Sequence, residues 1–148
     1  MGEQTIEPPN EAEREWIETN LGLARELVAA YTGSRPSGTP DASALDDAYA
    51  AWLADWSGRP PSERDDPNIF VNAFGLAFGQ CLADALELSW AVATDDAGTE
   101  IAVHGQPGDV LVFPPNLVGK RFERGETHFF APVLEEIRGQ VQALRGDT

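Results

Sequence analysis

The run from Pro67 to about Leu88 constrains this chain more than any other feature, because it is apolar on most sides of a helix. Asp66 can cap such a helix, and Pro67 can occupy its first position, where a missing backbone N–H costs little. A helix without a polar side has to be buried from several directions at once. The run therefore predicts a fold built around one central helix.

The same run does not read as a membrane span. Polar residues interrupt it at Asn72, Gln80, Asp84 and Glu87. A lipid-facing helix would not tolerate that many polar groups. The chain begins with acidic residues and prolines, and it lacks the basic and apolar regions of a secretory signal. We therefore expect a cytoplasmic protein that does not contact a membrane.

Two amphipathic helices are predicted before the central one. Asn10 and Glu13 have the spacing of a capping box, and apolar residues then recur along one face as far as Gly33. A second apolar stripe runs from Leu45 to about Gly58. Residues 1–58 are thus expected to form a two-helix N-terminal region.

After the central helix the pattern changes to strands. From Ser89 the side chains alternate, and a turn from Asp95 to Gly98 leads into a partner strand that reaches His104. A short apolar strand from Val110 to Phe113 follows, closed by two prolines. A short helix over about residues 116–124 and a final amphipathic helix from Phe130 complete the chain.

These elements predict an α+β fold in a single domain over residues 1–148. A three-stranded antiparallel meander packs against the buried helix and the C-terminal helix, which makes residues 68–145 an α-β-β-β-α core. The two N-terminal helices are expected to cover an edge or face of it. Gly75 and Gly79 lie one turn apart, so something should pack closely there, and the alanine side of the meander (Ala91, Ala93 and Ala102) is one surface that could do so. Core packing is favoured over a ligand groove.

The charge limits the possible partners. With 25 acidic and 10 basic residues the net charge is −15. Such a chain repels phosphate backbones, so nucleic-acid binding is not expected. The acidity fits a basic protein partner or nucleic-acid mimicry, and it fits equally a surface that only aids solubility. The oligomeric state is left open.

No catalytic or cofactor motif is present. Cys81, His104 and Asp95 are the residue types of a nucleophile, a base and an orienting carboxylate, but Cys81 lies in the middle of the apolar helix, where a thiol is protonated and inaccessible. The two histidines have no metal-ligand spacing, and there is no phosphate-binding or dinucleotide motif. We predict no catalytic residue, no metal site and no cofactor.

A local basic cluster stands out against the acidic background. Lys120 is the only lysine, and Arg121 and Arg124 follow it closely. The cluster could bind a carboxylate or phosphate, or it could anchor its helix to the acidic body by ion pairs and apolar stems. The anchoring interpretation is favoured.

The segment from about Asn68 to Leu144 resembles a bacterial family known as domain of unknown function 3806. The resemblance rests on these residues: Gly75 to Gly79, Leu82, Ser89 and Trp90, Asp95 with Gly98, Val112 to Pro114, Lys120 and Arg121, and Gly125 with Glu126. It implies no activity. If the family pattern marks a site, the residues that it implies are Trp90, Asp95, Lys120, Arg121 and Glu126, to which the basic cluster adds Arg124.

Two functions remain after these exclusions. The leading hypothesis is a non-enzymatic protein-interaction module, of which an antitoxin-like or immunity-like protein would be one version. The alternative is a small enzyme or metabolite-binding domain with an anion site near Lys120 and Arg121.

Overall fold

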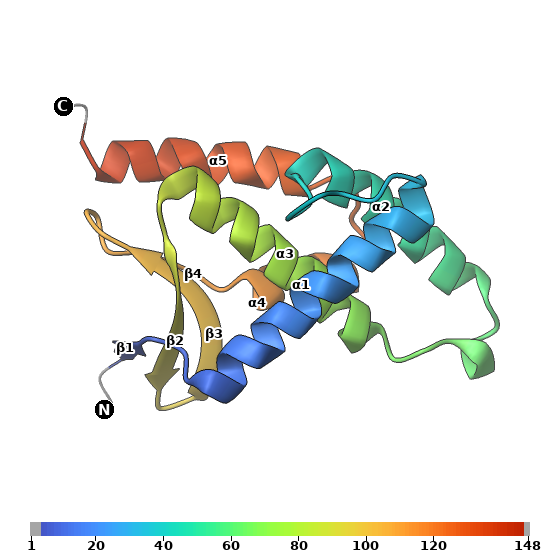
Figure 1. Ribbon diagram of the computed structural model, residues 1–148, viewed down its shortest axis with the longest axis horizontal. Helices are drawn as coiled ribbons and strands as arrows, with labels where there is room; N and C mark the ends of the chain where they lie inside the picture. Colours follow the sequence, from blue (N-terminus) through green and yellow to red (C-terminus); the bar gives the residue numbers. More distant parts are fainter. Residues whose placement is uncertain (1–3, 147–148) are drawn as a thin grey trace.

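The computed structural model describes residues 4–146, and it confirms an α+β fold. Figure 1 shows the strands gathered at one end of the molecule and the helices packed against and beyond them. The elements in chain order are β1 (Thr5–Glu7), α1 (Glu11–Thr32), α2 (Ala42–Gly58), the short 3-10 helix η1 (Pro61–Glu63), α3 (Pro67–Leu86), β2 (Ser89–Asp95), β3 (Gly98–Gly105), β4 (Val110–Val112), α4 (Pro114–Glu123) and α5 (Phe130–Leu144).

Helix α3 is the central element, as its sequence predicts. Phe74, Phe78 and Leu82 are completely buried, and α1, α2, α4 and α5 all contact the helix (Figure 1). By length and composition alone α3 could cross a membrane, but most of it is buried inside the fold. Its apolar sides are therefore covered by the protein's own elements.

The sheet has four antiparallel strands in the order β1-β2-β3-β4. The predicted hairpin is confirmed, with Ser89 opposite His104 at one end and Asp95 opposite Gly98 at the other. The prediction of three strands is wrong by one, because β1 pairs with residues 92–94 of β2. Three residues followed by two prolines are too few to show the alternation that identifies a strand.

The predicted boundary between β4 and α4 is also wrong. Pro114 and Pro115 begin the helix instead of closing a strand, and Phe113 precedes it as the N-cap residue. Proline suits the first turn of a helix because the backbone N–H groups there have no partner within the helix. The helix consequently starts two residues earlier than expected.

Gly75 and Gly79 allow α4 to lie directly on α3. A Cβ at Gly75 would stand 2.8 Å from the Pro115 Cα, and one at Gly79 would stand 2.6 Å from the Trp90 ring. Core packing is therefore the role of these glycines. The alanine side of the meander is not the surface that meets them, because neighbouring residues of a strand point to opposite faces and Trp90 occupies the face toward α3.

Asp46 of α2 fixes the start of α5. Its side chain is 6% exposed, and its two carboxylate oxygens accept hydrogen bonds from the backbone N–H groups of Phe130 at 2.7 Å and Ala131 at 3.0 Å. No side chain of its own segment caps α5. A carboxylate from another helix thus supplies both the hydrogen-bond acceptors and the negative charge that a helix N-terminus favours.

Candidate functional site

Trp90 forms the floor of an open hollow between α1 and β2, which we call the Trp90 groove. It has a volume of about 520 Å³ and is lined by Pro8, Pro9, Arg14, Ile17, Glu18, Ser89 and Trp90. Trp90 is half-buried, its Nε1 donates to the Oε1 of Gln80 at 2.9 Å, and one edge of its ring lies against Gly79. The indole is therefore held in place by α3 while part of it remains accessible from the α1 side.

The groove continues along the edge of β2. An adjoining hollow of about 280 Å³ shares Pro8, Ser89 and Trp90 with it and extends to Ala91 and His104. Pairing between β1 and β2 stops at Val92. If the register continued, Pro8 would stand opposite Ala91 and Pro9 opposite Trp90, but proline has no N–H to donate. In residues 4–146, the outer edge of β2 from Ser89 to Ala91 therefore has no strand beside it.

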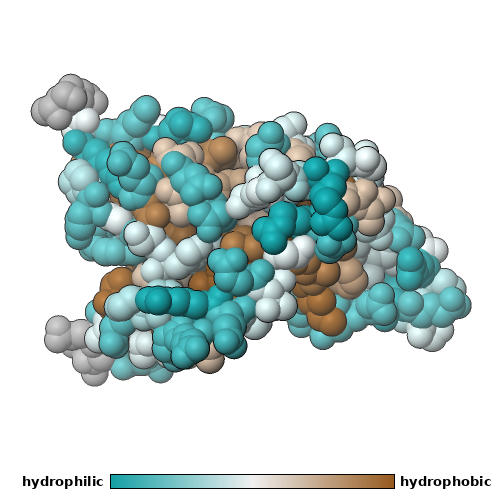
Figure 2. Space-filling view, in the orientation of Figure 1, coloured by the Kyte–Doolittle hydropathy of each residue, from teal (hydrophilic) through white to brown (hydrophobic). Residues whose placement is uncertain are grey.

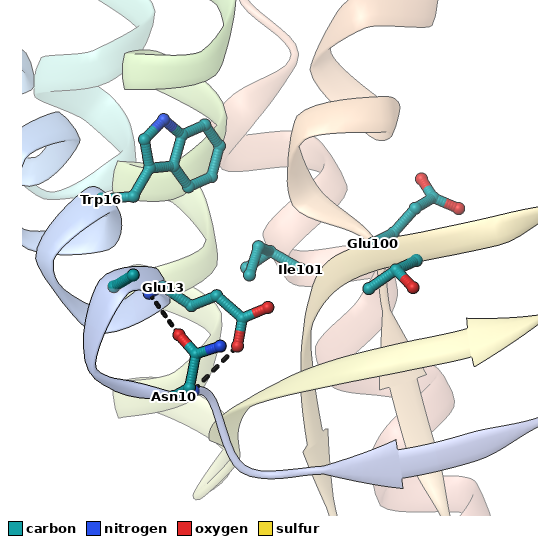
Figure 3. A pocket seen from close by; sticks show the side chains of 7 residues that line it. Asn10, Glu13, Trp16, Glu100 and Ile101 are labelled. Carbon is teal, nitrogen blue, oxygen red and sulfur yellow. Dashed lines mark hydrogen bonds between the residues drawn. The ribbon is translucent and has the colours of Figure 1, made fainter.

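A second hollow lies on the opposite flank of α1, and we call it the Trp16 pocket. It has a volume of about 270 Å³ and is lined by Asn10, Ala12, Glu13, Trp16, Thr99, Glu100 and Ile101. Figure 3 shows the Glu13 carboxylate and Ile101 facing the space between α1 and β3, with Trp16 one turn further along α1. The lining contains two carboxylates and no basic residue.

Glu13 has a structural task as well. Its Oε1 accepts a hydrogen bond from the Asn10 backbone N–H, and the Asn10 side chain accepts one from the Glu13 N–H, both at 2.8 Å (Figure 3). This is the capping box that the spacing of the two residues predicts. The box holds the Glu13 carboxylate at the pocket wall.

Asp95 lies at the far end of β2 from the Trp90 groove. Its Oδ1 accepts a hydrogen bond from the Ala97 N–H at 2.8 Å, inside the turn that joins β2 to β3. A short polar side chain that bonds two residues ahead is typical of tight turns. The geometry gives Asp95 a turn-forming contact and does not bring it to Trp90.

The basic cluster gathers at the end of α4. Arg121 donates from Nη1 to the Leu117 carbonyl at 3.2 Å, and its guanidinium lies 5.7 Å from the centre of the Phe129 ring. Arg124 forms an ion pair with Glu126 at 3.6 Å, while Lys120 is exposed. The five hollows described are lined by other elements. Arg121 and Arg124 are thus engaged within the fold, and the cluster is separate from the Trp90 groove.

Cys81 and His104 lie in different surroundings. The Cys81 thiol donates to the Pro40 carbonyl at 3.1 Å, and burial, followed by the nearby Asp84 and Asp41 carboxylates, raises its pKa from 9.0 to about 12. His104 Nε2 lies 2.7 Å from Asp109 Oδ1. Across residues 4–146, no group of three or more His, Cys, Asp or Glu side chains could hold a metal ion.

Residues 62–132 match the model of the family described as domain of unknown function (DUF3806). The resemblance inferred from the sequence motifs is therefore confirmed, over a segment that runs from the end of η1 to the start of α5. This segment contains Trp90 and excludes β1 and α1. Comparisons with curated proteins and with solved structures gave no match.

The sequence reasoning identified Trp90 but missed Trp16 and Pro8. Trp16 directly precedes the buried Ile17 and stands outside the apolar stripe of its helix, a position that marks an exposed aromatic residue. The pair Pro8-Pro9 also indicates a local feature, because two prolines end any strand that precedes them. Neither of these sequence features shows which part of the sheet Trp16 or Pro8 would contact.

Proposed function

We propose that this protein is a non-enzymatic protein-interaction module that binds an extended segment of a partner in the Trp90 groove. The observation that carries the proposal is the coincidence of two features at Ser89 to Ala91: a partly accessible indole and a strand edge that pairs with no other described strand. An extended peptide can add its backbone to such an edge while one of its side chains enters the adjacent hollow.

The composition of the groove supports a peptide ligand. Pro8, Ile17 and Trp90 provide apolar surface, and Arg14 and Glu18 stand at its rim with opposite charges. Aromatic residues and arginine are enriched where protein surfaces bind one another. Exposed strand edges are usually covered or charged to prevent unwanted pairing, so an edge left open beside an aromatic hollow is well placed to accept a strand.

The net charge of −15 favours a basic partner. An antitoxin-like or immunity-like protein that neutralises a basic toxin is one version of this function. In that version the acidic surface would raise the association rate, and the Trp90 groove would provide the specific contacts.

The test uses a substitution that blocks the groove without touching the core. Ser89 is exposed, so Ser89→Arg should fold normally and fill the groove with a long side chain. Ser62→Arg, at an exposed position of η1, adds the same charge elsewhere. Tagged proteins would be expressed in the source cells, captured and compared by quantitative mass spectrometry.

A partner that wild type and Ser62→Arg retain and Ser89→Arg loses would be purified, and its direct binding measured by calorimetry. We expect at least about a tenfold loss of affinity for Ser89→Arg, since a filled pocket removes the central contacts of an interface. Equal binding by all three proteins would contradict the groove as the docking surface.

A further inference from the structure

We infer that the Trp16 pocket binds an arginine side chain from a basic segment of the partner protein. The inference rests on the interaction role proposed above, and it names the chemistry of the partner at a different surface. The Trp90 groove and the Trp16 pocket lie on opposite flanks of α1, lined by Arg14, Ile17 and Glu18 on one side and by Ala12, Glu13 and Trp16 on the other.

Trp16 is unusually accessible for its size. The residue is 41% exposed, and only Ile69 and Leu144 among residues 4–146 are comparably exposed large apolar residues. No other aromatic ring or cation of the described chain contacts the Trp16 ring. The buried stripe of α1 is formed by its neighbour Ile17 with Leu21 and Ala24. The indole is therefore not needed to hold α1 on the core.

The charge beside the indole is negative, and one carboxylate oxygen there makes no hydrogen bond or ion pair within the described residues. Glu13 uses Oε1 in the capping box, and within the described residues its other oxygen has no ion-pair or hydrogen-bond partner. Glu100 adds a second carboxylate, although its side chain leaves β3 on the side away from Ile101 (Figure 3). Hydrophilic side chains also cover much of the molecular face in Figure 2.

An arginine fits these three features together. Its methylene stem can lie on Ile101, its planar guanidinium can stack on Trp16, and its N–H groups can donate to the free oxygen of Glu13. Cations favour the face of an indole more than that of any other ring. An apolar or acidic side chain would remove water from Glu13 without replacing the hydrogen bonds that the carboxylate loses, and a neutral polar side chain could donate a hydrogen bond but would leave the negative charge of Glu13 uncompensated.

The other possible occupants fit less well. A second copy of the chain would carry the same charge of −15 and would be repelled. A free small molecule would find a volume of about 270 Å³, which is below the roughly 300–1,000 Å³ typical of small-molecule sites. One long side chain anchored to a larger partner is the occupant that both the volume and the charge favour.

The experiment uses three short unstructured peptides in which glycine alternates with arginine, with lysine or with citrulline, the neutral counterpart of arginine. NMR follows the Trp16 indole N–H, which the Trp16→Phe spectrum identifies. We expect the arginine peptide to shift this signal and to bind at least about fivefold more tightly than the citrulline peptide, with the lysine peptide between them. Binding should weaken as salt is added, because the contact is partly ionic.

Two variants separate the pocket from general electrostatic attraction. Trp16→Ala keeps the net charge and should lose about fivefold or more in arginine-peptide affinity. Glu13→Gln removes one charge but preserves the capping box, in which glutamine is as suitable as glutamate. Glu136→Gln removes one charge at an exposed position of α5 and is the matched control. Circular dichroism confirms that each variant is folded.

Three results would overturn the inference: equal binding by Trp16→Ala and wild type, equal losses in Glu13→Gln and Glu136→Gln, or binding of free arginine as tightly as the peptide. The Ser89→Arg experiment reports on the Trp90 groove independently. If a partner requires the groove while the peptides ignore Trp16, the interaction function stands and this inference fails. If the peptides bind at Trp16 while no partner requires Ser89, the groove proposal fails instead.

Discussion

The buried carboxylate of Asp46 offers a sharp test of how the fold is assembled. It accepts the Phe130 and Ala131 N–H groups at 2.7 and 3.0 Å, from a position 84 residues earlier in the chain. Hydrogen bonds to charged groups contribute about 1.5–3 kcal/mol each, and the favourable charge at the helix terminus adds about 0.3–1 kcal/mol. Asp46→Ala removes all of these and leaves two backbone donors without an acceptor.

The two hydrogen bonds share one carboxylate, so their contributions are not fully additive, and we expect Asp46→Ala to lower the free energy of unfolding by about 3–5 kcal/mol, the lower part of their summed range. That is a large part of the roughly 5–15 kcal/mol available to a typical domain. At about 2–4 °C per kcal/mol for a chain of this size, the melting temperature should fall by roughly 6–20 °C. Asp46→Asn keeps one acceptor oxygen and should cost about half as much, since its NH2 group cannot accept a hydrogen bond from the second backbone N–H.

The measurement is urea denaturation followed by circular dichroism, with the denaturant slope checked for two-state behaviour. Asp47→Ala is the matched control, because Asp47 is the next residue of α2 and is exposed; it should stay within about 0.5 kcal/mol of wild type. A loss of less than about 1 kcal/mol in Asp46→Ala would refute the claim that this carboxylate anchors α5.

Three further predictions concern the core. Gly75→Ala should lower the free energy of unfolding by about 1–3 kcal/mol in urea denaturation, because its Cβ would lie 2.8 Å from the Pro115 backbone. Gly22→Ala in α1 is the control: its Cβ would lie 3.8 Å from the nearest atom, so this substitution should stabilise the protein by up to about 1 kcal/mol. Tyr49→Phe should match or exceed wild-type stability, since the buried Tyr49 hydroxyl has no hydrogen-bond partner among the described residues. A loss above about 1 kcal/mol would contradict this. Burial raises the pKa of Cys81 from 9.0 to about 12. The folded state therefore holds this proton more tightly, and stability should fall as pH rises from 9 toward 12, by up to about 1.4 kcal/mol per pH unit. Cys81→Ser should remove that dependence near pH 9–10, and an unchanged slope would show that other groups cause it.

The fold was predictable where one segment determines its own structure. The apolar run after Asp66 gave α3, the capping box gave the start of α1, and the alternation from Ser89 gave the hairpin. In each case the residues that carry the pattern are those that form the element or its end, so local propensity and periodicity were sufficient. The errors fell at β1 and at the start of α4, where prolines leave too few residues for a period to show.

The tertiary contacts were not predictable in the same way. Nothing near Phe130 indicates that its N–H needs Asp46, and nothing in the spacing of Gly75 and Gly79 indicates that a proline pair and an indole fill their surface. Such contacts depend on which elements become neighbours, and one sequence without related chains carries no direct record of that. The Trp90 groove and the Trp16 pocket were unpredictable for the same reason, because each lies between a face of α1 and a strand that is distant in sequence.

The segment that matches the family contains only part of each hollow. Residues 62–132 include Trp90, the β2 edge and Ile101, but Pro8, Glu13 and Trp16 lie outside them. The matched segment thus provides the floor of both hollows, while the N-terminal region provides their walls. A domain with a different N-terminal region would keep the indole, but it would keep the β2 edge open only if that region did not pair with Ser89 to Ala91, and it would change the charges around both hollows. Both proposed surfaces therefore depend on residues outside the matched segment, and we expect a preference for a basic partner at Trp16 to be particular to this chain.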